Sequence, residues 1–236
     1  MSVDASHLAG LVAERERVLT AFLEADAARI GPACLDMARA FSRGGVLIAY
    51  GTGPAATDAA HVAVEFMHPV IVGKRALPSL APAEPLGIAR PGDIALGIAH
   101  AAEDPAVTDF LRRARERGLL TMLLAGAGAG GRGRLAEHEF AVDSRDERVV
   151  QEVQETVYHV LWELVHVFFE HPGLLDEACI TCGDVAVEAE VVAVRNGTAV
   201  VEKDGVHEEV AVDLVEKVAV GDRLLCHAGV ALEKLA

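Results

Sequence analysis

His61 and Glu65 are the residues whose types and spacing best suit a metal site. They lie four apart in the segment 55–67, which is predicted to be a helix that ends before Pro69. On a helix this spacing places both side chains on one face, one turn apart. A neutral imidazole and a carboxylate are ligands that suit Zn²⁺ or a similar divalent ion. The pair alone is also compatible with a histidine and a glutamate that simply face solvent.

Two further candidate ligands, Gln151 and His159, lie on a long helix predicted over 147–170. Eight residues correspond to roughly 12 Å along an ideal helix. Two side chains that far apart can barely reach one ion. They could therefore serve the sites of different subunits, or only one of them could be a ligand. His68 and His166 belong to the same two helical regions, and we interpret both as structural histidines.

A third group of candidate residues lies near the end of the chain. Cys179 and Cys182 form a Cys-x-x-Cys pair, which could chelate zinc, act as a redox pair or be incidental. Cys226 and His227 could complete a Cys₃His zinc site, although adjacent residues on a strand point in opposite directions. A β-rich region follows the pair, which argues against thioredoxin-type chemistry, and for Cys226 a small buried residue is the favoured interpretation.

The elements that would position these residues differ in type along the chain. Up to about residue 171, helical and strand patterns alternate. Helices are predicted over 6–24, 30–42, 55–67, 105–118 and 147–170, and strands over 46–50, 94–99, 119–124 and 140–142. Apolar strands that alternate with helices indicate an α/β fold, a parallel sheet with helices on both faces. Ligands of such sheets bind at the carboxyl ends of the strands.

The pattern becomes β-rich after the sequence His171-Pro172-Gly173. Strands are predicted over 185–194, 198–203, 206–212 and 223–227. Asn-Gly at 196–197 and Asp-Gly at 204–205 lie between strand-like runs and are strong hairpin signals. Short strands over this length suggest a small OB-like barrel, closed to remove its edges. We therefore expect an α/β domain at 1–170, a linker at 171–178 and a β domain at 179–236.

The composition of the chain argues against some classes of binding partner. The chain has 236 residues and a formal net charge of -15, and both parts are acidic, which argues against binding nucleic acid or an anionic membrane. Its apolar runs are well under the ~20 residues that span a bilayer. No signal peptide is expected from the first residues. The four cysteines are too sparse for a disulfide framework, so the expected location is a reducing cytoplasm.

The segment from Gly51 to Glu65, GTGPAATDAAHVAVE, resembles Gly-Asn-Gly-Gly-Ser-Ala-x-Asp-Ala-x-His-x-x-x-Glu of the phosphoheptose (sedoheptulose 7-phosphate) isomerases, which are sugar isomerase (SIS) family members. Gln151-Glu152-Val153, with His159 eight residues later, is similar to that family's closing helix. Arg75-Ala76-Leu77-Pro78 resembles the family's segment after the metal helix. The resemblance covers roughly residues 5–170, in order.

This resemblance implies four ligands for a divalent metal, with zinc the expected ion: His61, Glu65, Gln151 and His159. It also implies that Glu65 and His159 form the acid/base pair that moves protons between the first two carbons of the sugar, a task that suits a carboxylate and an imidazole. The family forms tetramers with sites between subunits. A homotetramer or homodimer is therefore expected, and it would resolve the 12 Å separation of two ligands on one helix.

The two phosphate-binding loops of that family are altered here. Gly-Gly-Ser of the first loop is Gly53-Pro54-Ala55, and a Ser-Thr-Ser-Gly-Asn-Ser type loop is replaced by residues 100–105, HAAEDP. The hydroxyl groups are gone. The candidate substrate contacts in this chain are Gly53, Ala55 and Arg75.

Acidic residues have been added to the second loop. A dianion beside Glu103 and Asp104 would meet like charges, at a cost of about 4 kcal/mol at 4 Å. Backbone N–H groups of the helix that starts near Pro105 still attract anions, but we expect these two carboxylates to occupy that end themselves. Phosphosugar binding is therefore predicted to be weak or absent. A substrate without phosphate would also explain the departures.

The β-rich part resembles the HypC/HupF hydrogenase maturation chaperones over about 179–236. The resemblance rests on the segments Cys179–Asp184 (CITCGD), Asp213–Val215 (DLV), Val220–Leu225 (VGDRLL) and His227–Leu232 (HAGVAL). It implies that Cys179 takes the role of the family's cysteine, which carries an iron fragment for a [NiFe]-hydrogenase, and that His227 is its nearby histidine. A thiolate and an imidazole are suitable iron ligands. Cys182 is a weaker candidate, and Cys179 is internal in this chain, whereas that family begins with Met-Cys.

Both resemblances together predict an accessory factor in [NiFe]-hydrogenase maturation. Its partners would be maturation proteins or the hydrogenase large subunit. The fused parts would share a high effective concentration, which favours one joint role. Two alternatives stay open: an aldose–ketose isomerase with an appended β domain, and a non-catalytic scaffold.

Overall fold

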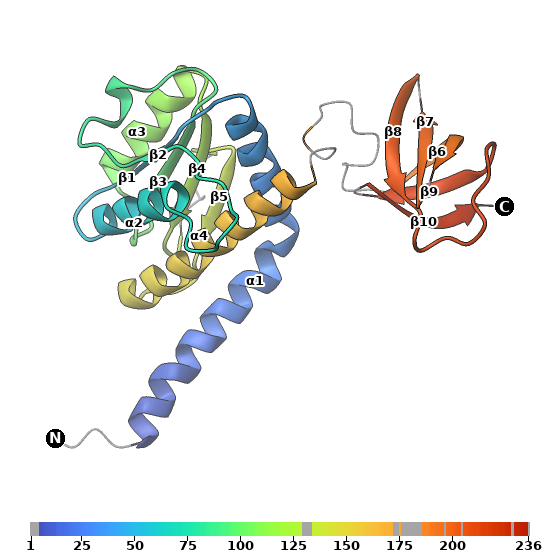
Figure 1. Ribbon diagram of the computed structural model, residues 1–236. Helices are drawn as coiled ribbons and strands as arrows, with labels where there is room; N and C mark the ends of the chain where they lie inside the picture. The colour runs from blue at the N-terminus through green and yellow to red at the C-terminus, as the bar shows by residue number, and fades with distance from the viewer. Residues whose placement is uncertain are drawn as a thin grey trace. The chain divides into compact units, whose positions relative to one another are not determined.

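The computed structural model describes residues 5–128, 134–171, 175, 186–195, 197–203, 205–227 and 229–235. The chain divides into two compact units, Met1–Val167 and Phe168–Ala236. The first unit is α/β and the second is built from strands (Figure 1).

A five-stranded parallel sheet forms the centre of the first unit. Its spatial order is β2 (Ser79–Leu80), β1 (Leu47–Gly51), β3 (Ile94–Ile98), β4 (Leu120–Ala125) and β5 (His138–Ala141). Every neighbouring pair is parallel. The predicted α/β class is confirmed. The sequence pattern missed β2, because two residues are too short a run to show alternation.

Helices cover both faces of this sheet. They are α1 (Ala5–Ser42), α2 (Ala55–Met67), α3 (Pro105–Glu116) and α4 (Glu147–Glu170), with a short 3₁₀ helix, η1, at Pro85–Gly87. On one face, Phe110 and Leu111 of α3 share a buried cluster with Ile48 of β1. Leu47 and Ala49 alternate with Ile48, so they point to the opposite face, and both are also buried. Strands buried on both sides explain the continuous apolar runs in the sequence.

α1 is one continuous helix of 38 residues, so the prediction of two helices, 6–24 and 30–42, is wrong about the gap. The residues between them include alanines, which are the strongest helix formers. Asp26 and Arg29 form an ion pair three residues apart across the expected break, and Arg29 also donates to the carbonyl of Glu139. Pro32 lies inside the helix without ending it.

The second unit contains a closed barrel. Its strand order is β10 (Val230–Leu235), β8 (Val206–Ala211), β7 (Thr198–Lys203), β6 (Val187–Arg195) and β9 (Arg223–His227). β10 pairs antiparallel with β9 and parallel with β8, which closes the ring. The predicted small barrel is confirmed. Its closing strand β10 was not predicted.

Alternating side chains fill the barrel. Ala189 and Val191 of β6, Val201 of β7, Val210 of β8 and Leu224 of β9 belong to its buried cluster. Gly197 and Gly205, the second residues of the Asn-Gly and Asp-Gly pairs, have positive φ angles of 82° and 81°, as these tight turns require. Among the residues that the structure describes, no helix is both long and apolar enough to cross a membrane.

Candidate functional site

The turn after β1 positions α2 and its candidate ligands. Gly51 ends the strand, and a Cβ at this position would lie 2.5 Å from the carbonyl oxygen of Ala55. Gly53 has a positive φ of 54°, which glycine adopts at little cost. These two glycines let the chain reverse tightly and begin α2 at Ala55, at the carboxyl end of β1. His61 and Glu65 follow on this helix.

His61, Glu65 and His159 come together between α2 and α4. One ligand atom from each of the three residues lies within 4.8 Å of those of the other two. The His61 Nε2 atom is 3.3 Å from Glu65 Oε1, and the rings of His61 and His159 have centroids 5.2 Å apart. All three side chains are half-buried. Two imidazoles and a carboxylate at this spacing fit a divalent cation with a further position open.

Tyr158 and Glu155 both lie close to the Nδ1 atom of His61. The Tyr158 hydroxyl lies 2.9 Å from His61 Nδ1, and Glu155 Oε1 lies 3.6 Å from the same nitrogen. Burial, and then the negative charges of Glu155, Asp58 and Glu65, raise the pKa of Tyr158. Its hydroxyl therefore stays protonated and keeps both donor and acceptor capacity. If His61 Nδ1 donates to this oxygen, Nε2 keeps a lone pair on the side of Glu65, which is the arrangement that a metal-binding histidine needs.

Gln151, the fourth predicted ligand, lies elsewhere. Its amide donates to both carboxylate oxygens of Asp58, at 3.0 and 3.4 Å. His100 Nε2 lies 2.6 Å from the same carboxylate, and both Asp58 and His100 are buried. The structure thus brings His61, Glu65 and His159 together and places Gln151 in a separate hydrogen-bonded group.

Sequence reasoning missed the group of Asp58, His100 and Gln151. A signal was present, because Asp58 precedes His61 by three residues and so lies on the same face of α2. The role of His100 could not be read from spacing, since this residue follows β3 and reaches Asp58 only through the fold.

The two histidines interpreted as structural behave differently. His166 is buried, and its ring nitrogens lie 2.8 Å from the Trp162 carbonyl oxygen and 3.0 Å from that of Arg75. This geometry ties α4 to the segment after α2. His68 caps the carboxyl end of α2, where its backbone N–H donates to the Val64 carbonyl, and its side chain is exposed.

The candidate residues of the barrel are only partly described. Cys226 is fully buried in the barrel core. Burial, and then the charge of Glu208, raises the pKa of its thiol to about 11, so it remains a neutral, small core residue. His227 is half-buried, and its Nδ1 atom is enclosed without a hydrogen-bond partner among the described residues. Cys179 and Cys182 lie outside the described residues.

The first unit is similar to curated phosphoheptose isomerases. The phosphoheptose isomerase of Pelobacter propionicus is 31% identical over 170 residues, which are 61% of this chain and 90% of the relative. That of Solidesulfovibrio magneticus is 31% identical over 185 residues, 69% of this chain and 90% of the relative. The chain belongs to the phosphoheptose isomerase family.

Solved structures of phosphoheptose isomerases have the same fold. The enzyme from Neisseria gonorrhoeae has a TM-score of 0.59 at 19% identity, over 69% of this chain and 98% of its own. The enzyme from Francisella tularensis has a TM-score of 0.53 at 19% identity, over 70% and 98%.

The barrel matches a different family. Residues 185–236 match the HupF/HypC family model. The chain is therefore a fusion of a phosphoheptose isomerase-type unit with a HupF/HypC-type unit, as the resemblances predicted. The matched region begins after Cys182, so the Cys-x-x-Cys pair lies outside it.

In this phosphoheptose isomerase-type unit, an acidic residue of the loop after β3 caps the helix that follows the loop. Asp104 is the N-cap of α3, and its Oδ1 atom accepts from the backbone N–H of Ala106 at 2.8 Å and of Val107 at 3.1 Å. Its other oxygen accepts from the hydroxyl of Thr52, in the turn after β1. Burial alone would raise the pKa of Asp104, but these three hydrogen bonds outweigh it and lower the pKa. The prediction that Glu103 and Asp104 occupy the positive end of this helix is confirmed for Asp104.

The predicted substrate contacts lie on three different parts of the first unit. Gly53 is exposed in the turn before α2, and Ala55 is buried as the first residue of that helix. Arg75 is exposed, and its carbonyl accepts from His166. Neither Gly53 nor Ala55 offers a side-chain hydroxyl, so any anion held there would depend on backbone N–H groups.

Proposed function

We propose that this protein is an accessory factor of [NiFe]-hydrogenase maturation. Its HupF/HypC-type barrel would act as the chaperone, and its phosphoheptose isomerase-type unit would hold a divalent metal ion without ordinary phosphosugar turnover. The observation that carries the second part is the Asp104 carboxylate, which takes up the free N–H groups of α3 and the hydroxyl of Thr52. A phosphate at this helix end would have to displace a carboxylate.

The donor set supports a metal ion in the first unit. His61, Glu65 and His159 offer two imidazole nitrogens and one carboxylate within mutual reach, and zinc is the ion that such ligands suit best. Gln151 could join them only by leaving Asp58. A bound ion would supply Lewis-acid polarisation of an oxygen ligand. The protein's own contribution is orientation, because Tyr158 fixes the ring of His61.

The proposal for the barrel is that Cys179 and His227 carry an iron fragment transiently, with Cys182 as a weaker candidate. The match of residues 185–236 to the HupF/HypC model supports a partner among hydrogenase maturation proteins or the large subunit. The Nδ1 atom of His227 has no hydrogen-bond partner among the described residues, which agrees with a ring that has one nitrogen left to bind another molecule.

The maturation role can be tested by co-purification from cells that assemble a [NiFe]-hydrogenase. We expect the tagged chain to retain maturation proteins or the large subunit, and to retain iron. Cys179→Ala should lower both yields about tenfold, since a ligand-bearing thiolate is lost. Thr181→Ala, which changes the residue between the two cysteines, is the matched control. Equal capture of partners by the Cys179→Ala and Thr181→Ala variants would contradict the assigned role of Cys179.

A second candidate function is aldose–ketose isomerisation, because the chain belongs to the phosphoheptose isomerase family and keeps His61, Glu65 and His159 together. In that case Glu65 and His159 would exchange protons with the first two carbons of the sugar. The test is turnover of sedoheptulose 7-phosphate with added Zn²⁺, beside a family member that has intact Ser/Thr loops. We expect at least a 10³-fold lower kcat/KM, equivalent to about 4 kcal/mol of lost transition-state stabilisation. Turnover comparable to that relative would establish the isomerase and refute the first proposal for this unit.

A further inference from the structure

An arginine-lined pocket lies at one edge of the parallel sheet in the first unit. It has a volume of about 810 Å³ and lies where the strands begin, beside Gly45 before β1, Asp93 before β3, Leu119 before β4 and Glu137 before β5. His61 and His159 are not among its lining residues. Sites of this size are typical of small-molecule binding, for which volumes of roughly 300–1,000 Å³ are usual.

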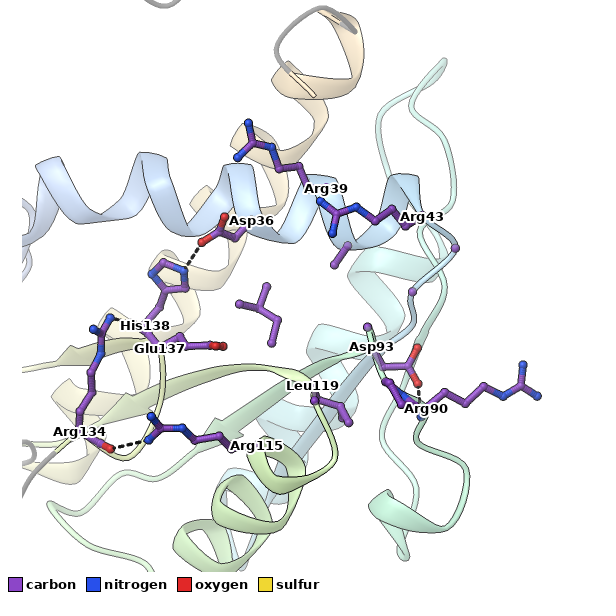
Figure 2. A pocket seen from close by; sticks show the side chains of 17 residues that line it. Asp36, Arg39, Arg43, Arg90, Asp93, Arg115, Leu119, Arg134, Glu137 and His138 are labelled. Atoms are coloured by element: carbon purple, nitrogen blue, oxygen red, sulfur yellow. Dashed lines mark hydrogen bonds and ion pairs between the residues drawn. The ribbon is translucent and has the colours of Figure 1, made fainter. Parts of the chain in front are cut away.

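Arginines dominate the charge of this pocket. Its lining includes the five arginines Arg39, Arg43, Arg90, Arg115 and Arg134. They come from the end of α1, the loop before β3, the last turn of α3 and the loop before β5 (Figure 2). The whole chain has only 21 basic residues and a net charge of -15. The pocket therefore concentrates positive charge in a chain whose net charge is negative.

Three acidic residues also line the pocket, and each has partners other than a guanidinium group. Asp36 lies 2.8 Å from His138 Nε2. Asp93 accepts from the backbone N–H groups of Val46 at 2.9 Å and Arg90 at 2.7 Å. Glu137 accepts from the backbone N–H of Thr121 at 2.9 Å. Asp93 and Glu137 thus hold the strand ends in place, and the pocket keeps an excess of arginine over carboxylate.

The helix dipole explains why some of these arginines lie where they do, but it does not explain all of them. Arg39 and Arg115 lie in the last turns of α1 and α3, where a positive charge is favoured by the helix dipole. Arg90 and Arg134 lie in loops, outside that explanation. The Arg90 guanidinium has no hydrogen-bond or ion-pair partner within the described parts of the chain.

Backbone carbonyls hold two of the guanidinium groups in position. Arg134 donates to the carbonyls of Ala136, at 3.1 Å, and Glu137, and Arg115 donates to the carbonyl of Arg134 at 3.3 Å. A guanidinium has five N–H donors, so each keeps donors for another molecule. Such orientation lowers the entropy lost when a ligand binds.

We propose that this pocket binds a small polyanion, a compound with two or more phosphate or carboxylate groups. Guanidinium groups match both oxyanions in planar, two-point geometry. The arginines enter from several separate segments around the pocket, so a ligand with charge at more than one point would satisfy them better than a single ion.

Calorimetric titration of the full chain tests this site, with pyrophosphate and citrate as probes and inorganic phosphate as the small reference. We expect saturable binding of pyrophosphate or citrate, at least tenfold tighter than that of phosphate and weakened by salt. The stronger of the two probes identifies a phosphate or a carboxylate ligand. Arg90→Gln and Arg134→Gln should each weaken binding about tenfold, the usual effect of one charged hydrogen bond.

Arg112→Gln is the matched control, because Arg112 lies on α3 but pairs with Asp109 and Glu116 outside the pocket. Thermal unfolding of each variant separates lost binding from lost folding. Two results would overturn the proposal: no saturable binding of pyrophosphate or citrate at millimolar concentration, or equal affinities in the Arg90→Gln, Arg134→Gln and Arg112→Gln variants.

Discussion

The cluster between α2 and α4 and the amino end of α3 are both built from polar groups, but they differ in which of those groups remain available to another molecule. In the cluster, His61, Glu65 and His159 keep ligand atoms within 4.8 Å of one another. At α3, the Asp104 carboxylate already satisfies two backbone N–H groups and the hydroxyl of Thr52. The first region keeps three potential ligand atoms within reach of one another, whereas the second already contains its own anion, the Asp104 carboxylate.

The charges around the His61, Glu65 and His159 cluster increase this difference between the two regions. Glu65 and Glu155 lie beside His61, and negative charge around the cluster contributes to the raised pKa of Tyr158. A surplus of carboxylate next to two imidazoles favours a bound cation, because the ion removes repulsion as well as gaining ligands. An anionic substrate would meet repulsion in both regions unless a metal ion were present first.

The largest expected effect is the loss of metal from the cluster when His61 is removed. His61→Ala deletes one of three clustered ligands, and we expect zinc affinity to fall by more than 100-fold, beyond the 10- to 100-fold typical of supporting residues. Elemental analysis after dialysis against a weak chelator measures it. His68→Ala is the control, because this exposed histidine also belongs to the α2 region. Wild-type protein without bound metal after zinc loading would contradict the assignment.

A smaller effect is expected from the residue that orients His61. Tyr158→Phe removes the hydroxyl 2.9 Å from His61 Nδ1 and leaves every ligand in place. Zinc affinity should fall about 10- to 100-fold, as for other supporting hydrogen bonds. Tyr50→Phe is the comparison, because Tyr50 packs against Phe110, away from the cluster. Competition with a chromogenic chelator gives both affinities, and equal values would show that Tyr158 only fills space.

The contrast between the two regions also shows what sequence could and could not predict. The i, i+4 spacing was enough to place His61 and Glu65 on one face, and the position of Glu103 and Asp104 before Pro105 was enough to predict a carboxylate at the positive end of α3. Tyr158, Glu155 and the pairing of Gln151 with Asp58 depend on which faces of α2 and α4 meet. That is decided by packing on the sheet rather than by local spacing.

The fold, like the site, could be predicted from the sequence only in part. The parallel sheet followed from apolar runs, and the barrel from Asn-Gly and Asp-Gly turns. β2 and β10 were missed, because two residues show no period and because Glu233 and Lys234 interrupt the alternation of β10 at a register shift. The uninterrupted α1 was missed because its alanine-rich middle has little apolar pattern, although its helix propensity is high.

The stability of the α3 end gives a third, smaller effect. Asp104→Ala removes the N-cap of α3 and should lower the free energy of unfolding by about 1 kcal/mol, within the usual range for caps. Asp109→Ala, on the exposed side of α3 where Asp109 pairs with Arg112 and Arg113, should change it by less than about 0.5 kcal/mol. Chemical denaturation measures both. If inorganic phosphate also stabilises Asp104→Ala but not the wild type, the helix end has been reopened to an anion.

The pH dependence of the same cap is the smallest expected effect. The folded pKa of Asp104 is lowered from its ordinary 3.8, so its charge stabilises the fold fully above that value, and the contribution is lost as pH falls through the folded pKa. Asn also caps helices well, so Asp104→Asn should be less stable than the wild type at pH 7 by only a few tenths of a kcal/mol. The gap should close as the pH falls through the lowered folded pKa of Asp104, where the wild-type carboxyl takes up its proton. Glu163→Gln, an exposed change on α4, is the control for general charge effects. A gap that stays constant as the pH falls from 7 through that pKa would mean that the charge of Asp104 contributes nothing, and that its cap works through hydrogen-bond geometry alone.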